Sequence, residues 1–260
     1  MKKTLIALAV AASAVVSGSA MAWTANGTGN SVELGGTLTP VAKVTPWEVK
    51  TGDAVTNLNA DVQKGQTSVI VNVNKSIPVL GIRNANAEGF QGISGIAPQI
   101  DYRNAVDLSG FKAGVTTVTL EVRDSANGNK IGSLSAPFSV AGLMTWKNHL
   151  GHSGNSELYA PTAGDGFFGG VGYDVKAAST SRGEALLASL DPEFMDKFST
   201  FSSKWSSSIE KFDKDSVTYK GVYGSGIESG KNITITFDTA VAGDSQIQWK
   251  ASLPVTVTYM

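Results

Sequence analysis

The sequence contains no cysteine, which excludes disulfide bonds, thiol nucleophiles and thiolate metal sites. It also has no excess of charge of either sign, because 21 basic residues face 22 acidic ones and the net charge is -1. A chain this close to neutral has no electrostatic footprint for nucleic acid or for an anionic membrane. Of its 260 residues only 17% are charged and 42% are hydrophobic, so we expect a globular chain and not a disordered one.

Long hydrophobic runs are missing as well, except at the start. Two lysines precede an apolar run over residues 5–16, and residues 20–22 (Ala-Met-Ala) fit the small-x-small pattern cut by signal peptidase. We therefore predict that residues 1–22 are a secretory signal peptide. A membrane anchor is the alternative, but this run is shorter than the ~20 residues that span a bilayer, and no later run is long enough.

Most of the remaining chain alternates apolar and polar residues, as half-buried β-strands do. Residues 67–73 place three valines on one face, and residues 116–122 and 232–237 repeat the pattern. Asn127-Gly128 is a strong signal for a hairpin turn. Short alternating strands separated by turns favour a mainly β fold, a β-sandwich. Further strands are expected over residues 77–82, 131–140, 217–223 and 246–260.

The alternation largely stops between about residues 143 and 215, which we interpret as an insertion in the sandwich. Within it, residues 164–172 are rich in Gly and Phe and are predicted to form a loop. Ser181 and Glu184 form a capping box that predicts a short helix ending at Leu190.

A second helix is predicted directly after the first, because Asp191-Pro192 is typical of a helix start. Apolar residues follow at helical spacing, and we expect their stripe to pack on the sandwich. A cofactor or lipid groove is the alternative interpretation of the same stripe. The stripe comprises Phe194, Phe198, Phe201, Trp205, Ile209 and Phe212.

The two ends of the predicted mature chain carry complementary patterns. Near its start, four positions at period 2 predict a lone strand, which Pro40 and Pro46 separate from the body. Near its end, the alternation continues to the penultimate residue. One copy's leading strand could therefore fill a gap in another copy's sheet, and the alternative is an ordinary first strand that pairs within its own sheet. The leading positions are Val32, Leu34, Gly36 and Leu38, and the terminal positions are Leu253, Val255, Val257 and Tyr259.

These two ends, with the signal peptide and the absence of cysteine, resemble chaperone/usher fimbrial subunits of Gram-negative bacteria, and in particular the adhesive major subunits of the kappa class. The resemblance is scattered over most of the chain, and the middle insertion is its least similar part. It is carried by residues 35–38 (Gly-Gly-Thr-Leu), 47–52 (Trp-Glu-Val-Lys-Thr-Gly), 130–133 (Lys-Ile-Gly-Ser), 226–230 (Gly-Ile-Glu-Ser-Gly), 248–249 (Gln-Trp) and 253–260 (Leu-Pro-Val-Thr-Val-Thr-Tyr-Met).

The resemblance implies an incomplete immunoglobulin-like sandwich that lacks its last strand. It implies a signal peptide at 1–22, a donor-strand extension at 23–40, and a pilin domain at 41–260 with an adhesive insertion at about 143–215. In such fimbriae a periplasmic chaperone lends a strand to the open groove. At the outer-membrane usher the leading strand of the next identical subunit replaces it, and the fibre extends from the cell surface. Val32, Leu34, Gly36 and Leu38 then form the donor strand, and Leu253, Val255, Val257 and Tyr259 form the strand that edges the groove.

The resemblance also implies that the insertion binds host galactose-type glycans. Sugars of this type stack on an aromatic ring while polar side chains bind their hydroxyl groups. The alternative is that the aromatic residues are the core of the insertion. The predicted glycan-binding residues are Trp146, Tyr159, Asp165, Phe168 and Lys176.

Other motifs give no competing function. Residues 164–169 spell GxGxxG, but no strand precedes them and no helix follows at once, so we predict no dinucleotide site and no cofactor. His149 and His152 lack an obvious third ligand, and we predict no metal. Asp213 and Asp215 could serve a secreted glycosidase, but solvated charges explain them better, so we predict no enzyme. A minor or tip subunit of the same fimbria remains the alternative to a major subunit.

Overall fold

The computed structural model describes residues 34–39, 44–178 and 182–260. The chain divides into two units, residues 1–43 and 44–260, which are described separately. In the first unit, residues 34–39 have no regular secondary structure, and Leu34 and Leu38 are 93% and 96% exposed. The predicted signal peptide and Val32 lie outside the described residues, so the first strand and its pairing stay predictions.

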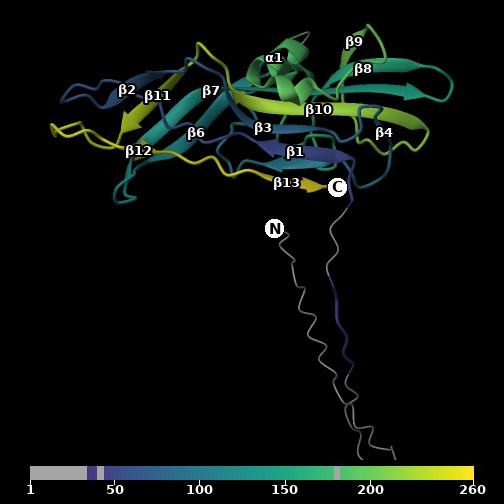
Figure 1. The fold of residues 1–260 in the computed structure, drawn as a ribbon, viewed down its shortest axis with the longest axis horizontal. Helices are drawn as coiled ribbons and strands as arrows, with labels where there is room; N and C mark the ends of the chain where they lie inside the picture. The colour runs from purple at the N-terminus through teal and green to yellow at the C-terminus, as the bar shows by residue number, and fades with distance from the viewer. Residues whose placement is uncertain (1–33, 40–43, 179–181) are drawn as a thin grey trace, which may run out of the picture. The chain divides into compact units, whose positions relative to one another are not determined.

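The second unit is mainly β, as the alternation predicts (Figure 1). Its helical elements are η1 (Val175–Ala177), α1 (Gly183–Leu190) and η2 (Pro192–Met195). No helix in the described part of the chain combines the length and the apolar character needed to cross a membrane. Its strands are β1 (Trp47–Thr51), β2 (Ser68–Asn72), β3 (Ile77–Asn84), β4 (Phe90–Gln91), β5 (Pro98–Asp101), β6 (Val115–Asp124), β7 (Lys130–Asn148), β8 (Ser153–Leu158), β9 (Trp205–Ser208), β10 (Val217–Ile227), β11 (Asn232–Phe237), β12 (Trp249–Lys250) and β13 (Thr256–Tyr259).

The long strand β7 organises the main sheet. Its first half pairs with β6 and β11, and its second half pairs with β10 and β8, all of them antiparallel. The path continues from β10 through β3 to β1 and from β11 to β2, while β12 adds to β6 and β9 adds in parallel to β8. A two-stranded sheet of β5 and β13 completes an architecture consistent with an immunoglobulin-like sandwich.

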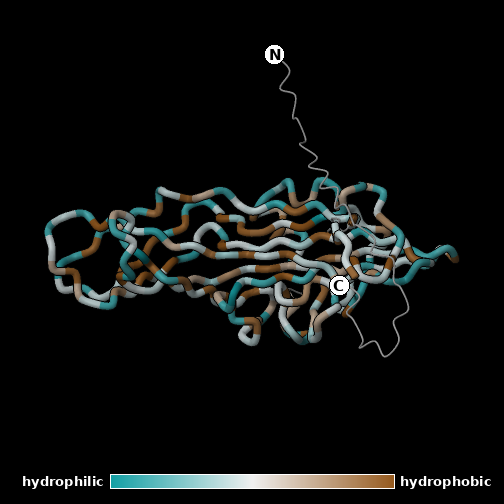
Figure 2. The backbone as a smooth tube through the Cα atoms, turned by 90° about the horizontal axis from the view of Figure 1, so that it is seen from below, coloured by the Kyte–Doolittle hydropathy of each residue, from teal (hydrophilic) through white to brown (hydrophobic). Residues whose placement is uncertain are grey.

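The predicted strand faces are confirmed. Val71, Val118, Ile233 and Ile235 are each 1% exposed, while their neighbours along each strand face outward. Apolar and polar residues alternate in the same way along the strands in Figure 2. The predicted turn at Asn127-Gly128 joins β6 to β7, with Gly128 in the left-handed region at a φ of 78°.

A second, smaller hydrophobic core lies where α1 packs across β7 and β10 (Figure 1). Helix α1 covers the predicted residues and ends at Leu190 as expected, although Ser181 of the predicted capping box lies outside the described residues. Phe194 of η2 lies on Gly81 and Gly224, where a Cβ atom would collide with its ring. Glycine at these two positions therefore lets the aromatic ring contact the sheet backbone. The buried members of this core are Ala141, Leu143, Leu186, Leu187, Leu190, Phe194, Phe198 and Val222.

The predicted long second helix is wrong. Asp191 does begin a helical turn, since its Oδ1 accepts a hydrogen bond from the Glu193 N–H at 3.0 Å, but η2 ends at Met195. Residues 205–208 instead form strand β9 beside β8, and Phe212 has a φ of 58°, which no helix permits. The stripe is split between the two cores and β9 because the serines at 202, 203 and 206–208 disfavour a helix. Contacts with β8 hold the segment, since the Ser202 carbonyl accepts a hydrogen bond from the Asn155 side chain and the Ser206 hydroxyl bonds to that of Ser156.

Candidate functional site

A groove of 1540 Å³ opens in the sandwich beside the last segment of the chain. One wall is formed by residues 51–62, and the other is formed by residues 243–253 and Val255. Both walls belong to the second unit. The floor consists of apolar side chains from six strands: Val69 and Val71 (β2), Ile77, Pro78 and Val79 (β3), Val118 and Leu120 (β6), Leu134 and Phe138 (β7), Ile227 (β10), and Ile233, Ile235 and Phe237 (β11).

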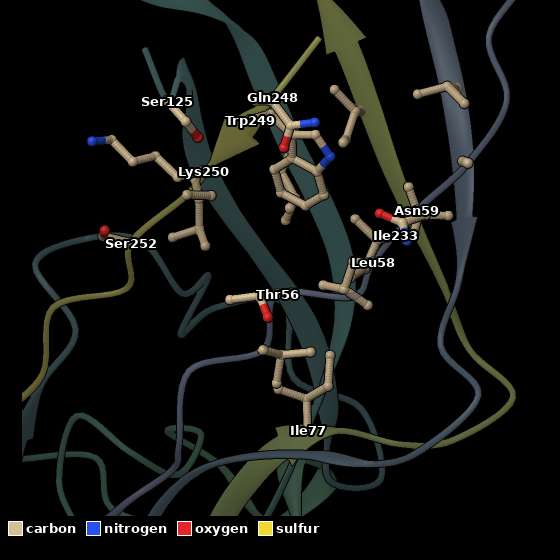
Figure 3. A pocket seen from close by; sticks show the side chains of 18 of the residues that line it. Thr56, Leu58, Asn59, Ile77, Ser125, Ile233, Gln248, Trp249, Lys250 and Ser252 are labelled. Carbon is tan, nitrogen blue, oxygen red and sulfur yellow. The ribbon is translucent and has the colours of Figure 1, made fainter. Parts of the chain in front are cut away.

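The floor of the groove is the hydrophobic core itself. Val71, Phe138 and Ile235 are among its most deeply buried side chains, yet all three line the groove. Figure 3 shows Leu58 of one wall, Trp249 of the other wall and Ile233 of the floor around the groove. A core reached by an open groove is the arrangement expected of a sandwich with one strand missing.

The walls carry main-chain groups available for pairing. Among the described residues, no main-chain hydrogen bond involves residues 53–62 or residues 251–255. The second of these stretches runs between two anchored strands, because β12 pairs with β6 and β13 pairs with β5. Polar backbone groups at an open sheet edge are a template for an added strand.

The loops that continue from the two walls are fastened to each other. The Gly65 N–H donates to the Val241 carbonyl at 2.8 Å, and the Val241 N–H donates to the Gln66 carbonyl at 3.0 Å. Lys64 and Asp244 form an ion pair between the same loops. These contacts hold residues 63–66 to residues 241–244, so the wall residues next to them are fixed in place.

The predicted groove-edge residues lie in the terminal segment, and their alternation is as predicted. Leu253 and Val255 line the groove, whereas Val257 and Tyr259 lie in β13, which pairs with β5. All four side chains are half-buried against the main core, and the residues between them are exposed. The regular strand begins only at Thr256, so the segment that edges the groove is extended but unpaired.

Sequence reasoning missed the opposite wall of the groove. Residues 51–62 follow Trp47, whose indole N–H donates to the Ile96 carbonyl at 2.7 Å and anchors β1, a strand that the neighbouring prolines concealed. The sequence signal that could have revealed this wall is a weak alternation with a period of two residues. It comprises Ala54, Thr56, Leu58, Ala60 and Val62, all of which line the groove.

Asp165, one of the predicted glycan-binding residues, is 2% exposed. Its Oδ2 accepts hydrogen bonds from the Thr162 N–H and the Thr162 hydroxyl at 2.9 and 2.8 Å, and its main-chain carbonyl accepts one from Gln99. The adjacent Phe167 inserts into the main core with no exposed surface. These contacts build the loop that the glycine-rich sequence predicts.

The other four predicted glycan-binding residues differ in exposure. Trp146 on β7 and Tyr159 after β8 are half-buried, and Lys176 in η1 is exposed. Phe168 is half-buried, with its ring centroid 6.2 Å from that of Tyr173, a residue 40% exposed. The structure thus places Asp165 and Phe168 in one loop and does not bring the five residues together around the groove.

A buried tyrosine pair fixes this loop to the sandwich. The Tyr102 hydroxyl lies 2.9 Å from the Tyr223 hydroxyl and 2.7 Å from Ser225 Oγ, and the Tyr223 hydroxyl donates to the Gly170 carbonyl. Burial raises the pKa of Tyr102 to about 12, so both phenols stay neutral and serve as hydrogen-bonding groups.

The comparisons with known proteins agree with this architecture. The family described as "Fimbrial, major and minor subunit" matches residues 1–260. The chain belongs to this family of fimbrial subunits. K88 fimbrial proteins AB and AC of Escherichia coli are 31% and 30% identical to it, and F41 fimbrial protein of the same organism is 28% identical. Each alignment covers the whole of both chains.

Membership confirms the predicted class of protein. The chain is a subunit of K88/F41-type fimbriae, a structural and adhesive component of an extracellular, cell-surface fibre and not an enzyme. Fimbrial subunits assemble with one another, so the open groove is the feature whose occupant the function must explain.

Proposed function

We propose that the chain is the major structural subunit of an adhesive fimbria and polymerises by donor-strand complementation. In this proposal Val32, Leu34, Gly36 and Leu38 of one copy enter the groove of the next copy. The single observation that carries it is the groove, whose floor is the hydrophobic core and whose walls carry unpaired main-chain groups. Leu34 and Leu38, in turn, are almost fully exposed apolar side chains in a segment without regular structure.

The energetics favour such an exchange. Full burial of one Val or Leu side chain contributes about 1.5–3 kcal/mol, so three of them contribute about 5–9 kcal/mol before the ordering of the segment is subtracted. Main-chain hydrogen bonds to the walls add to this contribution. At the third donor position Gly36 has no side chain, so the inserted backbone can lie close to the floor.

The open groove also explains why partners are needed before assembly. A core exposed at this size favours aggregation of the unassembled subunit. We therefore infer that a periplasmic chaperone fills the groove first and that an outer-membrane usher directs the exchange. A minor or tip subunit would have the same groove; immunogold label along the whole fibre supports the major subunit, whereas label only at the tip supports the alternative.

Deletion of residues 23–38 tests the assembly proposal. We expect the truncated subunit to be exported and bound by chaperone but unable to form fibres. A synthetic peptide of residues 31–39 should then bind it and raise its unfolding free energy by about 2.7 kcal/mol at a peptide concentration of 100 Kd. A control peptide with Leu34→Asp and Leu38→Asp should give no increase. Fibre formation by the truncated subunit would contradict the proposal.

We also propose that the insertion binds host galactose-type glycans. The support is the half-buried Phe168 beside the exposed Tyr173, with the exposed Lys176 in the η1 turn that follows. Trp146 and Tyr159 remain members of the proposed site, and Asp165 shapes its loop. Fibres with Phe168→Ala, Tyr159→Ala or Lys176→Ala should lose binding on a glycan array, while a Lys112→Ala control should retain it. Unchanged binding in all three variants would contradict this placement.

A further inference from the structure

A second cavity, of 330 Å³, lies on the other side of the terminal segment that edges the groove. It is bounded by β6, by the turn after β5 and by residues 250–254. We propose that it binds an acidic sugar, that is, a sugar carrying a carboxylate or a sulfate group. The residues that line it are Arg103, Asn104, Ala105, Thr119, Leu120, Glu121, Arg123, Lys250, Ala251, Ser252 and Pro254.

The terminal segment lies between the two cavities and lines both of them. Its half-buried residues, among them Trp249, Ala251 and Leu253, face the apolar groove. The exposed residues Lys250 and Ser252 alternate with them. Lys250, Ala251 and Ser252 line both cavities and so form the boundary that the two share (Figure 3).

Three cations from three separate elements surround this cavity, against one carboxylate, Glu121. Arg123 pairs with Glu121 and also donates to the Gly128 carbonyl. Arg103 engages Asp101 through its Nε only, at 3.3 Å, so both terminal nitrogens of its guanidinium remain available among the described residues. Lys250 has no ion pair in the described part of the chain. Arg103 and Lys250 thus retain the donors that a bound anion requires.

The backbone holds Arg103 in position. Arg103 and Asn104 are consecutive residues in the left-handed region, with φ values of 53° and 64°. The Arg103 N–H donates to Asp101 Oδ1 at 2.7 Å, and the Ala105 N–H donates to the Tyr102 carbonyl at 3.0 Å, so a tight turn is fixed beside the buried Tyr102 ring. The turn therefore fixes the Arg103 backbone at the cavity, while its side chain is 65% exposed.

The size and the lining of the cavity select the ligand. Its volume lies at the lower end of the range typical of small-molecule sites, which suits one sugar ring and its acidic group. No aromatic ring is among the described residues that line it, so stacking of a neutral sugar has no platform there. The hydroxyl groups of Thr119 and Ser252 and the amide of Asn104 can bind sugar hydroxyls, while Arg103 and Lys250 bind the acid.

Titration of the full-length subunit with three monosaccharides tests this site. Galactose 6-sulfate and N-acetylneuraminic acid represent the two acidic groups, and galactose is the uncharged control. We expect binding of one or both acidic sugars, weakened by added salt. Galactose, which we propose binds to the insertion, should have the same affinity for the parent and for Arg103→Gln. Arg103→Gln and Lys250→Gln should each weaken the acidic sugar by about 10-fold or more, since each removes a charge-assisted hydrogen bond. Lys231→Gln and Lys112→Gln, two exposed lysines outside the cavity, should have no effect.

Several results would overturn the inference. If Arg103→Gln weakened galactose as much as the acidic sugars, or if the lysine control variants showed equal losses, the cavity would not recognise the acidic group. If free inorganic sulfate binds as tightly as galactose 6-sulfate, the sugar ring does not contribute to binding, and the proposal of a sugar site is contradicted. Fibre assembly should be normal in the Arg103→Gln variant, because Arg103 does not line the groove, so failure of this site is distinguishable from failure of donor-strand complementation.

Discussion

Two apolar surfaces of the same sandwich differ in whether other parts of the chain cover them. On the β7–β10 surface, the chain supplies its own cover, since α1 places Leu187 on Gly224 and η2 places Phe194 on Gly81 and Gly224. At the groove, residues 44–178 and 182–260 supply no cover, and core side chains such as Phe138 and Ile235 form an open floor. This difference indicates that the open groove is confined to the position of one strand and does not reflect loose packing of the whole sandwich.

Polar contacts reinforce the contrast. The covering segment is fastened to β1, because Lys50 pairs with Asp191 and Glu193 at 2.8 Å and Lys197 pairs with Glu48 at 2.7 Å. The facing walls of the groove, residues 53–62 and 251–255, have no main-chain hydrogen bonds to described residues. One surface is thus closed by apolar packing and ion pairs, and the other keeps its hydrogen-bonding groups for an added strand.

The largest expected effect comes from opening the closed surface. Phe194→Ala should lower the unfolding free energy by about 3–5 kcal/mol, because it removes a buried ring and leaves a cavity over two glycines. Leu150→Ala, at a residue 68% exposed, should stay within about 0.5 kcal/mol and serves as the control. Denaturant unfolding of the peptide-complemented subunit measures both.

The same variant separates the two surfaces. Phe194→Ala should leave the affinity for the 31–39 peptide unchanged, since the ring does not line the groove. If Phe194→Ala also lowered the affinity for the peptide, the two surfaces would be coupled, and the claim that they are independent would be contradicted.

An intermediate effect is expected in the loop of the insertion. Asp165→Asn should cost about 1–3 kcal/mol, because the buried carboxylate accepts two hydrogen bonds from Thr162 and an amide oxygen accepts them less strongly. Thermal unfolding measures the loss. Glycan binding by the folded variant should persist. If the variant lost glycan binding while its stability was unchanged, Asp165 would be a glycan-binding residue.

The fold was predictable where alternation alone decides structure. The strands over residues 68–72, 115–124 and 232–237 follow from period 2, and α1 follows from its local signals. The segment after Met195 was not predictable from spacing, because its aromatic residues are distributed between two cores and β9 by tertiary contacts. Strand β1 was concealed by Pro46, although Trp47 fixes it in the core.

The candidate site was predictable on one side only. Leu253 and Val255 are large apolar residues at period 2, and they mark the groove edge in the sequence. The opposite wall consists of small and polar residues around Leu58, most of them exposed. Because this wall buries little apolar surface, it has only a weak hydrophobic pattern in the sequence, as the proposed completion by another chain would require.

The smallest effect concerns the ion pairs that fasten the cover. Hydrogen bonds from Lys197 and then Arg83 hold the pKa of Glu48 below its usual 4.5. Since the folded-state pKa is the lower one, the ionised carboxylate stabilises the fold above pH 4.5, and this contribution disappears as the pH falls through the folded value. Glu48→Gln should therefore lower Tm slightly at pH 7, with little difference from the parent at pH 3. A Tm difference that persists at pH 3 would contradict this role.

Disulfide trapping between two single-cysteine variants tests the central claim most directly, because the chain has no cysteine of its own. One variant carries Leu34→Cys, and the other carries Leu253→Cys or Val255→Cys. If the leading segment of one copy fills the groove of another, fibres grown from the mixture form covalent dimers with one of the two partners, since paired strands bring Cα atoms within disulfide range, about 4.4–6.8 Å. A double variant with both cysteines in one chain is the comparison. If only this double variant forms a cross-link, and the link lies within one chain, the segment completes its own molecule and the account is contradicted.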